Sequence, residues 1–258
     1  MAPYSISELD PGSAKALQAD LLAVADTKLV LGNWFNLCVN NGRSLPDFAA
    51  LLGMSATVLG HARSLYLYLV NFGHSYETLE QGRGAGEISS MNLLDAPPQS
   101  WEDFIASIYL AEQATWMLIS GFVNHPDRAL SGLAKKIGQE TYFHLKYANG
   151  WAAIFAESGG KAFAAALEQR YPSALRWFDD TDADALHEAG QRTVPLATLK
   201  EGFANEIAKI VDTAGLKLKL PASVDPGDDW RPESRRNGVL SDRLYEVIRF
   251  KDPEAAHP

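Results

Sequence analysis

Apolar residues recur along much of the chain at the three- and four-residue spacings that form one face of an α-helix. Four such stretches fill most of residues 13–157 and predict four long helices of about 35 to 45 Å each. Their ends carry helix signals. Ser44 and Ser100 are suited to cap N-termini, and Asn40-Asn41-Gly42 and Gly159-Gly160 are suited to end helices. Ser13 is the expected N-cap of the first helix. The pattern predicts an all-α protein.

The connections between these helices indicate their arrangement. The first and second helices are separated by only a few residues, and so are the third and fourth, so each pair is expected to be antiparallel. The second and third are separated by residues 73–99, which are rich in Gly, Ser and Pro. A connection of that length can cross the bundle from end to end. Two hairpins joined by one long crossover predict a ferritin-like four-helix bundle.

After Gly160 the helical pattern becomes shorter and less regular. The alternation of Leu and Lys over 216–220 favours an extended segment, and the polar stretch 221–237 favours a loop. We expect a single ferritin-like domain over residues 1–258, with its core bundle at about 13–157 and additional C-terminal helices at about 160–250. The expected C-terminal helical pieces lie near 161–170, 173–189, 195–213 and 241–250.

Composition narrows the class of protein. Hydrophobic residues make up 47% of the 258, which is sufficient for a sizeable core, and no apolar run approaches the roughly 20 residues of a membrane span. The N-terminus lacks the pattern of a signal peptide, and Cys38 is the only cysteine. The net charge of −9 argues against nucleic-acid binding. We therefore expect a cytoplasmic protein that binds neither membrane nor nucleic acid.

One cationic cluster stands out against this acidic background, and it lies in the C-terminal third of the chain. We interpret it as an exposed, solvated loop, with a contact for an acidic partner or for phosphate groups as the alternative. Its members are Lys217, Lys219, Arg231, Arg235 and Arg236.

Each long helix also places an ionisable residue of a metal-ligating type on its apolar face. Buried charges are rare unless they are paired or bind a metal, so these residues are the candidates for chemistry. They are Asp26, His61, Glu112, Glu140 and His144.

A carboxylate-bridged di-iron site in such a bundle needs one carboxylate from each of two helices and a Glu-x-x-His pair from each of the other two. The residues three and four before His61 are Val58 and Thr57, so that helix supplies no acid. Glu140 and His144 are spaced by four residues rather than three. We therefore expect no metal and interpret the five candidates as a degenerate site.

With three candidate carboxylates in place of four, metal affinity is expected to be weak. The favoured interpretation is a buried network in which the carboxylates pair with the histidines or with Lys28 or Lys146. The alternative is a retained or altered site for two iron ions, because a π-bulge in the fourth helix would bring Glu140 and His144 back into register.

An ordered series of residues resembles the phenylacetic acid degradation family, whose members form the oxygenase part of ring-1,2-phenylacetyl-CoA epoxidase. The likeness extends over about residues 20–250 and is greater to the non-catalytic structural subunit than to the iron-bearing one. The residues that carry it are Asp26 with Leu29-Val30-Leu31, then Leu59-Gly60-His61-Ala62-Arg63, Trp101, Glu140 with His144-Leu145, and Gly150-Trp151.

This resemblance implies a structural subunit of a di-iron oxygenase in aerobic aromatic catabolism. Such a subunit holds no cofactor of its own and supports an iron-bearing paralogous subunit, to which a reductase component delivers electrons. We expect a hetero- or homo-oligomer, with an apolar interface that uses aromatic residues such as Tyr66, Tyr68, Trp101 or Trp151. The alternative is a metal-dependent oxygenase that itself acts on an aromatic or acyl-CoA substrate, with the five candidates as ligands.

Overall fold

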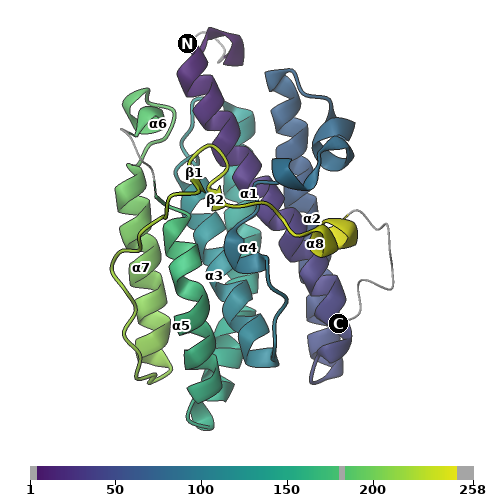
Figure 1. The fold of residues 1–258 in the computed structure, drawn as a ribbon, viewed down its shortest axis with the longest axis vertical. Helices are drawn as coiled ribbons and strands as arrows, with labels where there is room; N and C mark the ends of the chain where they lie inside the picture. The colour runs from purple at the N-terminus through teal and green to yellow at the C-terminus, as the bar shows by residue number, and fades with distance from the viewer. Residues whose placement is uncertain (1–4, 180–183, 249–258) are drawn as a thin grey trace.

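Four long helices form the body of the molecule in the computed structural model, which describes residues 5–179 and 184–248. They are α1 (Pro11–Cys38), α2 (Leu45–Leu69), α3 (Trp101–Ser120) and α4 (Arg128–Glu157). The helices run roughly along the long axis of the molecule, as Figure 1 shows. Within the described residues, the two short strands near the C-terminus are the only β structure. The all-α prediction is confirmed.

A polar side chain precedes each of the long helices and accepts a hydrogen bond from a backbone N–H two or three residues further on. This contact satisfies an N–H that has no partner inside the helix. The four capping residues are Asp10, Ser44, Ser100 and Asp127. The prediction of Ser13 as the first cap is wrong. Asp10 accepts from Ser13 N, and Pro11 is suited to the first helical position.

The helices pack as two hairpins, α1 with α2 and α3 with α4, and contacts of α1 with α3 and of α2 with α4 close the bundle. Two glycines permit close approach between helices. A Cβ at Gly32 would lie 2.7 Å from Leu59 Cδ2, and a Cβ at Gly138 would lie 2.3 Å from Trp116 Cζ3. The long crossover of residues 73–99 joins the hairpins, so the ferritin-like arrangement is confirmed.

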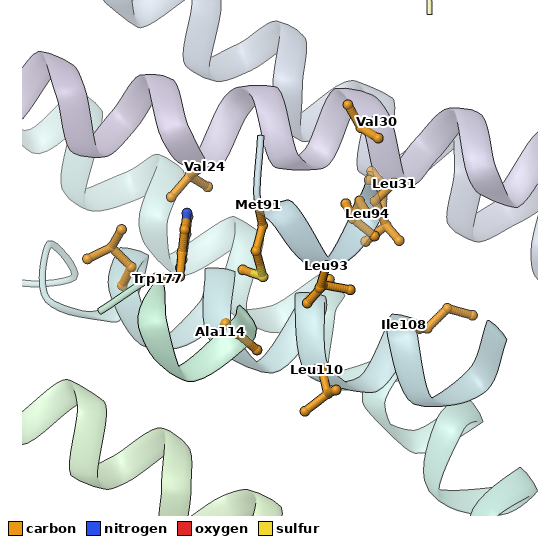
Figure 2. Packing of buried hydrophobic residues seen from close by; sticks show 14 of the residues in the cluster. Val24, Val30, Leu31, Met91, Leu93, Leu94, Ile108, Leu110, Ala114 and Trp177 are labelled. Atoms are coloured by element: carbon orange, nitrogen blue, oxygen red, sulfur yellow. The ribbon is translucent and has the colours of Figure 1, made fainter. Parts of the chain in front are cut away.

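The crossover also contributes to the hydrophobic core. Figure 2 shows Met91, Leu93 and Leu94 between the side chains of α1 and those of α3. Because the crossover covers a side of α1 that the other long helices leave open, the buried residues of α1 run without a break over 23–35. Because α1 is enclosed on all sides over these residues, its charged side chains must be neutralised by partners inside the protein.

The C-terminal third adds a second layer of helices. Helices α5 (Lys161–Arg176) and α7 (Leu196–Thr213) both pack against α3, on the side of the bundle away from α2 (Figure 1). The remaining elements are α6 (Ala185–Glu188), β1 (Trp230–Arg231), β2 (Arg236–Asn237) and α8 (Asp242–Ile248), and β1 pairs antiparallel with β2. Residues 216–220 are non-helical, as predicted. Residues 180–183 and 249–250, for which a helix was predicted, lie outside the described residues.

The interpretation of the cationic cluster as an exposed loop is wrong for two of its members. Arg235 and Arg236 are buried. Arg235 donates hydrogen bonds to Asp20 Oδ1 and to the Trp177 carbonyl, and Arg236 donates to Ser90 and to Asp95 Oδ2. The adjacent guanidinium groups therefore fix this segment, which we call the C-terminal arm (residues 216–240), to α1 and to the crossover.

The aromatic residues expected at an interface are used inside the chain instead. Tyr66, Tyr68 and Trp101 are buried, and Trp151 donates a hydrogen bond to Asp47 Oδ1 at the N-terminus of α2. The prediction that these residues anchor an outer interface is therefore wrong for Tyr66, Tyr68 and Trp101. No helix within residues 5–179 and 184–248 combines the length and the apolar composition needed to cross a membrane.

Candidate functional site

A network of buried charges lies in the centre of the bundle, where α1, α3 and α4 meet. Lys28 on α1 donates a hydrogen bond from Nζ to Glu112 Oε2 on α3, and both side chains are fully buried. The other carboxylate oxygen of Glu112 lies 3.1 Å from His144 Nδ1 on α4. The Thr141 hydroxyl, one turn before His144, donates to Glu112 Oε2 at 3.4 Å. Both oxygens of Glu112 are therefore engaged by protein groups.

The charge of this network is balanced internally. Burial by itself raises the pKa of Glu112, but the ammonium of Lys28 and the ring of His144 outweigh that effect and hold the pKa well below its usual range. Glu112 is therefore an anion at neutral pH, and its nearest cation is the ammonium of Lys28. A lysine ammonium is a compact charge with three donors, which suits a small site among carboxylate and hydroxyl oxygens.

Asp26 lies only two residues before Lys28 but belongs to a separate cluster. Two residues along an α-helix turn a side chain by about 200°, so Asp26 faces the crossover and not the centre of the bundle. Arg83 of the crossover holds its carboxylate with two hydrogen bonds of 2.7 and 2.5 Å. Tyr66 Oη and the backbone N–H of Ser89 donate to it at 2.6 Å each. Asp26 is thus fully occupied by the protein.

The remaining two candidates form a pair between α2 and α4. His61 Nε2 lies 2.6 Å from Glu140 Oε2, and the His61 ring is buried whereas the Glu140 side chain is 37% exposed. Burial and the nearby charge of Lys28 lower the pKa of His61 to about 4, against the opposing effects of Glu112 and Glu140. His61 is therefore neutral at neutral pH. Its ring centre lies 6.3 Å from that of His144, which links the pair to the central network.

The structure therefore brings four of the five predicted residues together and separates the fifth. His61, Glu112, Glu140 and His144 lie in one contiguous cluster, and Asp26 points elsewhere. Of the two lysines suggested as counter-ions, Lys28 is in the network. Lys146 is exposed instead and lies over the Tyr142 ring.

These residues do not fit a pair of iron ions. The two-iron arrangement requires four carboxylates and two histidines that converge with free lone pairs. Here Glu112 accepts hydrogen bonds from Lys28, Glu140 is paired with His61, and the third carboxylate is held by Arg83. Among the described residues, no three His, Cys, Asp or Glu side chains form a group that would hold a metal ion.

Sequence reasoning missed Arg83, although this residue determines the role of Asp26. It lies in Gly82-Arg83-Gly84-Ala85-Gly86, a stretch whose glycines predict a flexible loop. The structure buries Arg83, which also donates to the carbonyls of Leu79 and Glu87. The only sequence signal was Asp26 itself, an acid on an apolar face that required a cation.

Comparison with known proteins identifies the family of this chain. A search of curated proteins gives no match. The sequence model of the family described as phenylacetic acid catabolic protein matches residues 7–241, which include the four long helices and the whole charge network. The match also includes α5, α7 and most of the segment that follows them. The chain therefore belongs to the phenylacetic acid catabolic protein family.

Proposed function

We propose that this protein is the structural, non-catalytic subunit of a multicomponent di-iron oxygenase of the phenylacetyl-CoA epoxidase type. In this role it supports an iron-bearing paralogous subunit in aerobic aromatic catabolism. Family membership supports a place in phenylacetate catabolism. The position of Lys28 supports the non-catalytic role, because its ammonium bonds the buried carboxylate that a metal site would need free.

The physical reasoning concerns charge balance. A buried carboxylate requires a cation or several hydrogen-bond donors, and in a di-iron bundle the metal ions supply that charge. Here one ammonium supplies it for Glu112, and one guanidinium supplies it for Asp26. The bundle thereby keeps a ferritin-like shape without needing bound metal to stabilise it. Such a chain is suited to assembly with a paralogue of similar shape, and a reductase component would serve that paralogue.

Metal analysis of the purified protein tests this proposal directly. We expect the isolated chain to contain no stoichiometric iron, and its melting temperature to stay constant on titration with iron, manganese or zinc. Co-expression with a family member that carries two Glu-x-x-His motifs should give a stable complex with iron in the partner alone. Two irons per chain after aerobic isolation, with metal-dependent stabilisation lost in Glu140→Ala, would instead establish the oxygenase alternative.

A further inference from the structure

A cleft of about 420 Å³ lies between α4 and α7, each of which packs against α3. It is lined by residues of the segments 146–153 and 206–214 together with Tyr109 of α3, and we call it the α4/α7 cleft. Small side chains leave this space open, since Ala152, Ala153 and Ala214 line it. Its volume lies in the range of about 300–1,000 Å³ that small-molecule sites occupy. No member of the central charge network lines it, so the cleft is a separate candidate site.

Tyr109 forms the floor of the α4/α7 cleft, and its hydroxyl group has no partner. The residue is only 5% exposed, yet its hydroxyl group makes no hydrogen bond with any residue that the structure describes. The hydroxyl oxygen is not one of the fully enclosed polar atoms that lack a partner, so it opens into the cleft that Tyr109 lines. Buried polar groups are normally hydrogen-bonded, and a buried tyrosine normally finds a partner for its hydroxyl group. The free hydroxyl group therefore indicates a ligand that reaches the floor.

The charges beside Tyr109 determine which ligand group fits there. Burial and the negative charge of Glu206 raise the pKa of Tyr109 to about 12, so its hydroxyl group is protonated at neutral pH and can donate. Glu206 accepts a hydrogen bond from Lys209 at one carboxylate oxygen, and its other oxygen has no partner among the described residues. A ligand hydroxyl group both accepts and donates a hydrogen bond. It is therefore suited to bind between Tyr109 and Glu206.

The α4 side of the cleft carries a cation without a carboxylate partner. The ammonium of Lys146 lies over the Tyr142 ring, and within the described residues it forms no ion pair. Two lysines and one glutamate line the cleft, which gives it a net charge of +1, whereas the whole chain has a net charge of −9. A cationic ligand would meet only Glu206, which Lys209 already neutralises. An anionic ligand group would instead pair with Lys146.

We propose that the α4/α7 cleft binds a small organic acid that carries a hydroxyl group at the opposite end of an apolar body. The ligand hydroxyl group binds Tyr109 and Glu206, the ligand carboxylate binds Lys146, and the apolar body packs against the alanines of the cleft. Both polar ends are needed, because each satisfies a group that the protein leaves unpaired. This inference concerns side chains outside the central charge network and does not rest on the proposed function.

The test uses 6-hydroxyhexanoate as the probe and measures its affinity for the full chain at neutral pH by saturation-transfer NMR titration. We expect a Kd of about 1 mM or tighter, which is within the usual efficiency of a ligand of roughly nine non-hydrogen atoms. Hexanoate lacks the hydroxyl group and hexane-1,6-diol lacks the carboxylate, so each should bind about fivefold to tenfold more weakly. A Kd above about 10 mM for 6-hydroxyhexanoate, or equal affinity for all three compounds, would overturn the proposal.

Two variants assign the ends of the ligand to the two ends of the cleft. Tyr109→Phe should weaken binding of 6-hydroxyhexanoate about fivefold to tenfold and leave hexanoate unchanged, because hexanoate has no group that the tyrosine hydroxyl would bind. Lys146→Met should weaken both acids and leave hexane-1,6-diol unchanged. The matched controls are Tyr171→Phe, which removes a buried hydroxyl group outside the cleft, and Lys136→Met, which changes an exposed lysine elsewhere on α4. Both controls should bind like the wild-type chain.

A third variant tests whether the compounds bind in the α4/α7 cleft. Ala153 is exposed and lines the cleft, so Ala153→Leu should fill part of the space and weaken all three compounds at least about tenfold. Ala129→Leu, at an exposed alanine of α4 away from the cleft, is its control. Because the Tyr109 hydroxyl group has no internal hydrogen bond to lose, Tyr109→Phe should melt within about 2 °C of the wild-type chain. Wild-type affinity in Ala153→Leu would place the bound acid elsewhere and refute the proposal.

Discussion

Lys28 and Glu112 illustrate how a single residue changes the character of a bundle interior. Taking both charges out of water is unfavourable, and their attraction offsets that cost only because each is close to the other and hydrogen-bonded. Once the pair is formed, removal of either partner leaves a charge in an apolar environment. The pair is thus weakly stabilising when it is complete and strongly destabilising when it is broken.

We expect Lys28→Met to destabilise the protein by about 3–5 kcal/mol, because the Glu112 carboxylate loses its cation. The double variant Lys28→Met with Glu112→Leu should recover most of that loss, since no buried charge is left uncompensated. Urea denaturation measures both values. The matched control is Lys146→Met, which changes an exposed lysine on α4 and should change stability by no more than about 0.5 kcal/mol. Equal losses for the single and the double variant would contradict this account.

Helix α1 shows why local pattern reveals some contacts and not others. Its apolar periodicity identified Asp26 as a charge on a buried face, and the structure confirms that burial. Periodicity gives no information about the partner, which comes from residue 83 on the crossover, a stretch without helical pattern. The helix ends behave differently. Ser44 and Ser100 act within three residues of themselves, so the sequence was sufficient to predict them.

Arg83 joins the crossover to α1 through Asp26, so loss of its guanidinium should loosen that element. We expect Arg83→Met to destabilise the protein by about 3–5 kcal/mol, because Asp26 keeps only two neutral donors. Hydrogen exchange should accelerate over residues 78–95. In Arg63→Met, which breaks the pair between the exposed Arg63 guanidinium and Glu80, the loss should be no more than about 1 kcal/mol. Unchanged exchange in the crossover of Arg83→Met would show that other contacts hold it.

At the scale of the whole molecule, the bundle and its topology were predictable because helix periodicity and connection lengths are local properties of the chain. The attachment of the C-terminal arm to the bundle was not predictable in this way. Its cationic residues indicated a solvated loop, whereas Arg235 finds Asp20, 215 residues earlier. Likewise the four central site residues were predicted from their helix faces. Their pairing depends on how far each helix is rotated in the bundle, which sequence spacing does not determine.

The buried network also determines how the stability of the whole protein responds to acid. His61 has a folded pKa of about 4, below the value of 6.5 for an unperturbed histidine, so between these pH values the unfolded chain binds more protons. Stability therefore falls as pH is lowered from 6.5 towards 4. The lowered pKa of Glu112 adds a further loss, which begins as pH falls through the ordinary range of a glutamate and continues below it.

We expect the free energy of unfolding from urea titrations to decrease between pH 6.5 and 4.5, with a contribution from His61 of at most about 1.4 kcal/mol per pH unit. His61→Gln should make the profile shallower in this range, since glutamine does not titrate, while the lowered pKa of buried His125 maintains part of the slope. His187→Gln, which changes a histidine outside the network, should leave the slope as it is in the wild-type chain. An identical slope in His61→Gln and the wild-type chain would assign the acid sensitivity to other groups.

The attachment of the C-terminal arm has a consequence for the order in which the chain acquires its structure. Asp20 belongs to the first long helix to be synthesised, but its cations Arg192 and Arg235 belong to the last third of the sequence. Because the chain is synthesised from its N-terminus, the first helices are available before these arginines exist, and contacts of such long separation form slowly. A nascent bundle therefore carries an unneutralised carboxylate at the position that the arm will later close. Only the finished polypeptide can bury it.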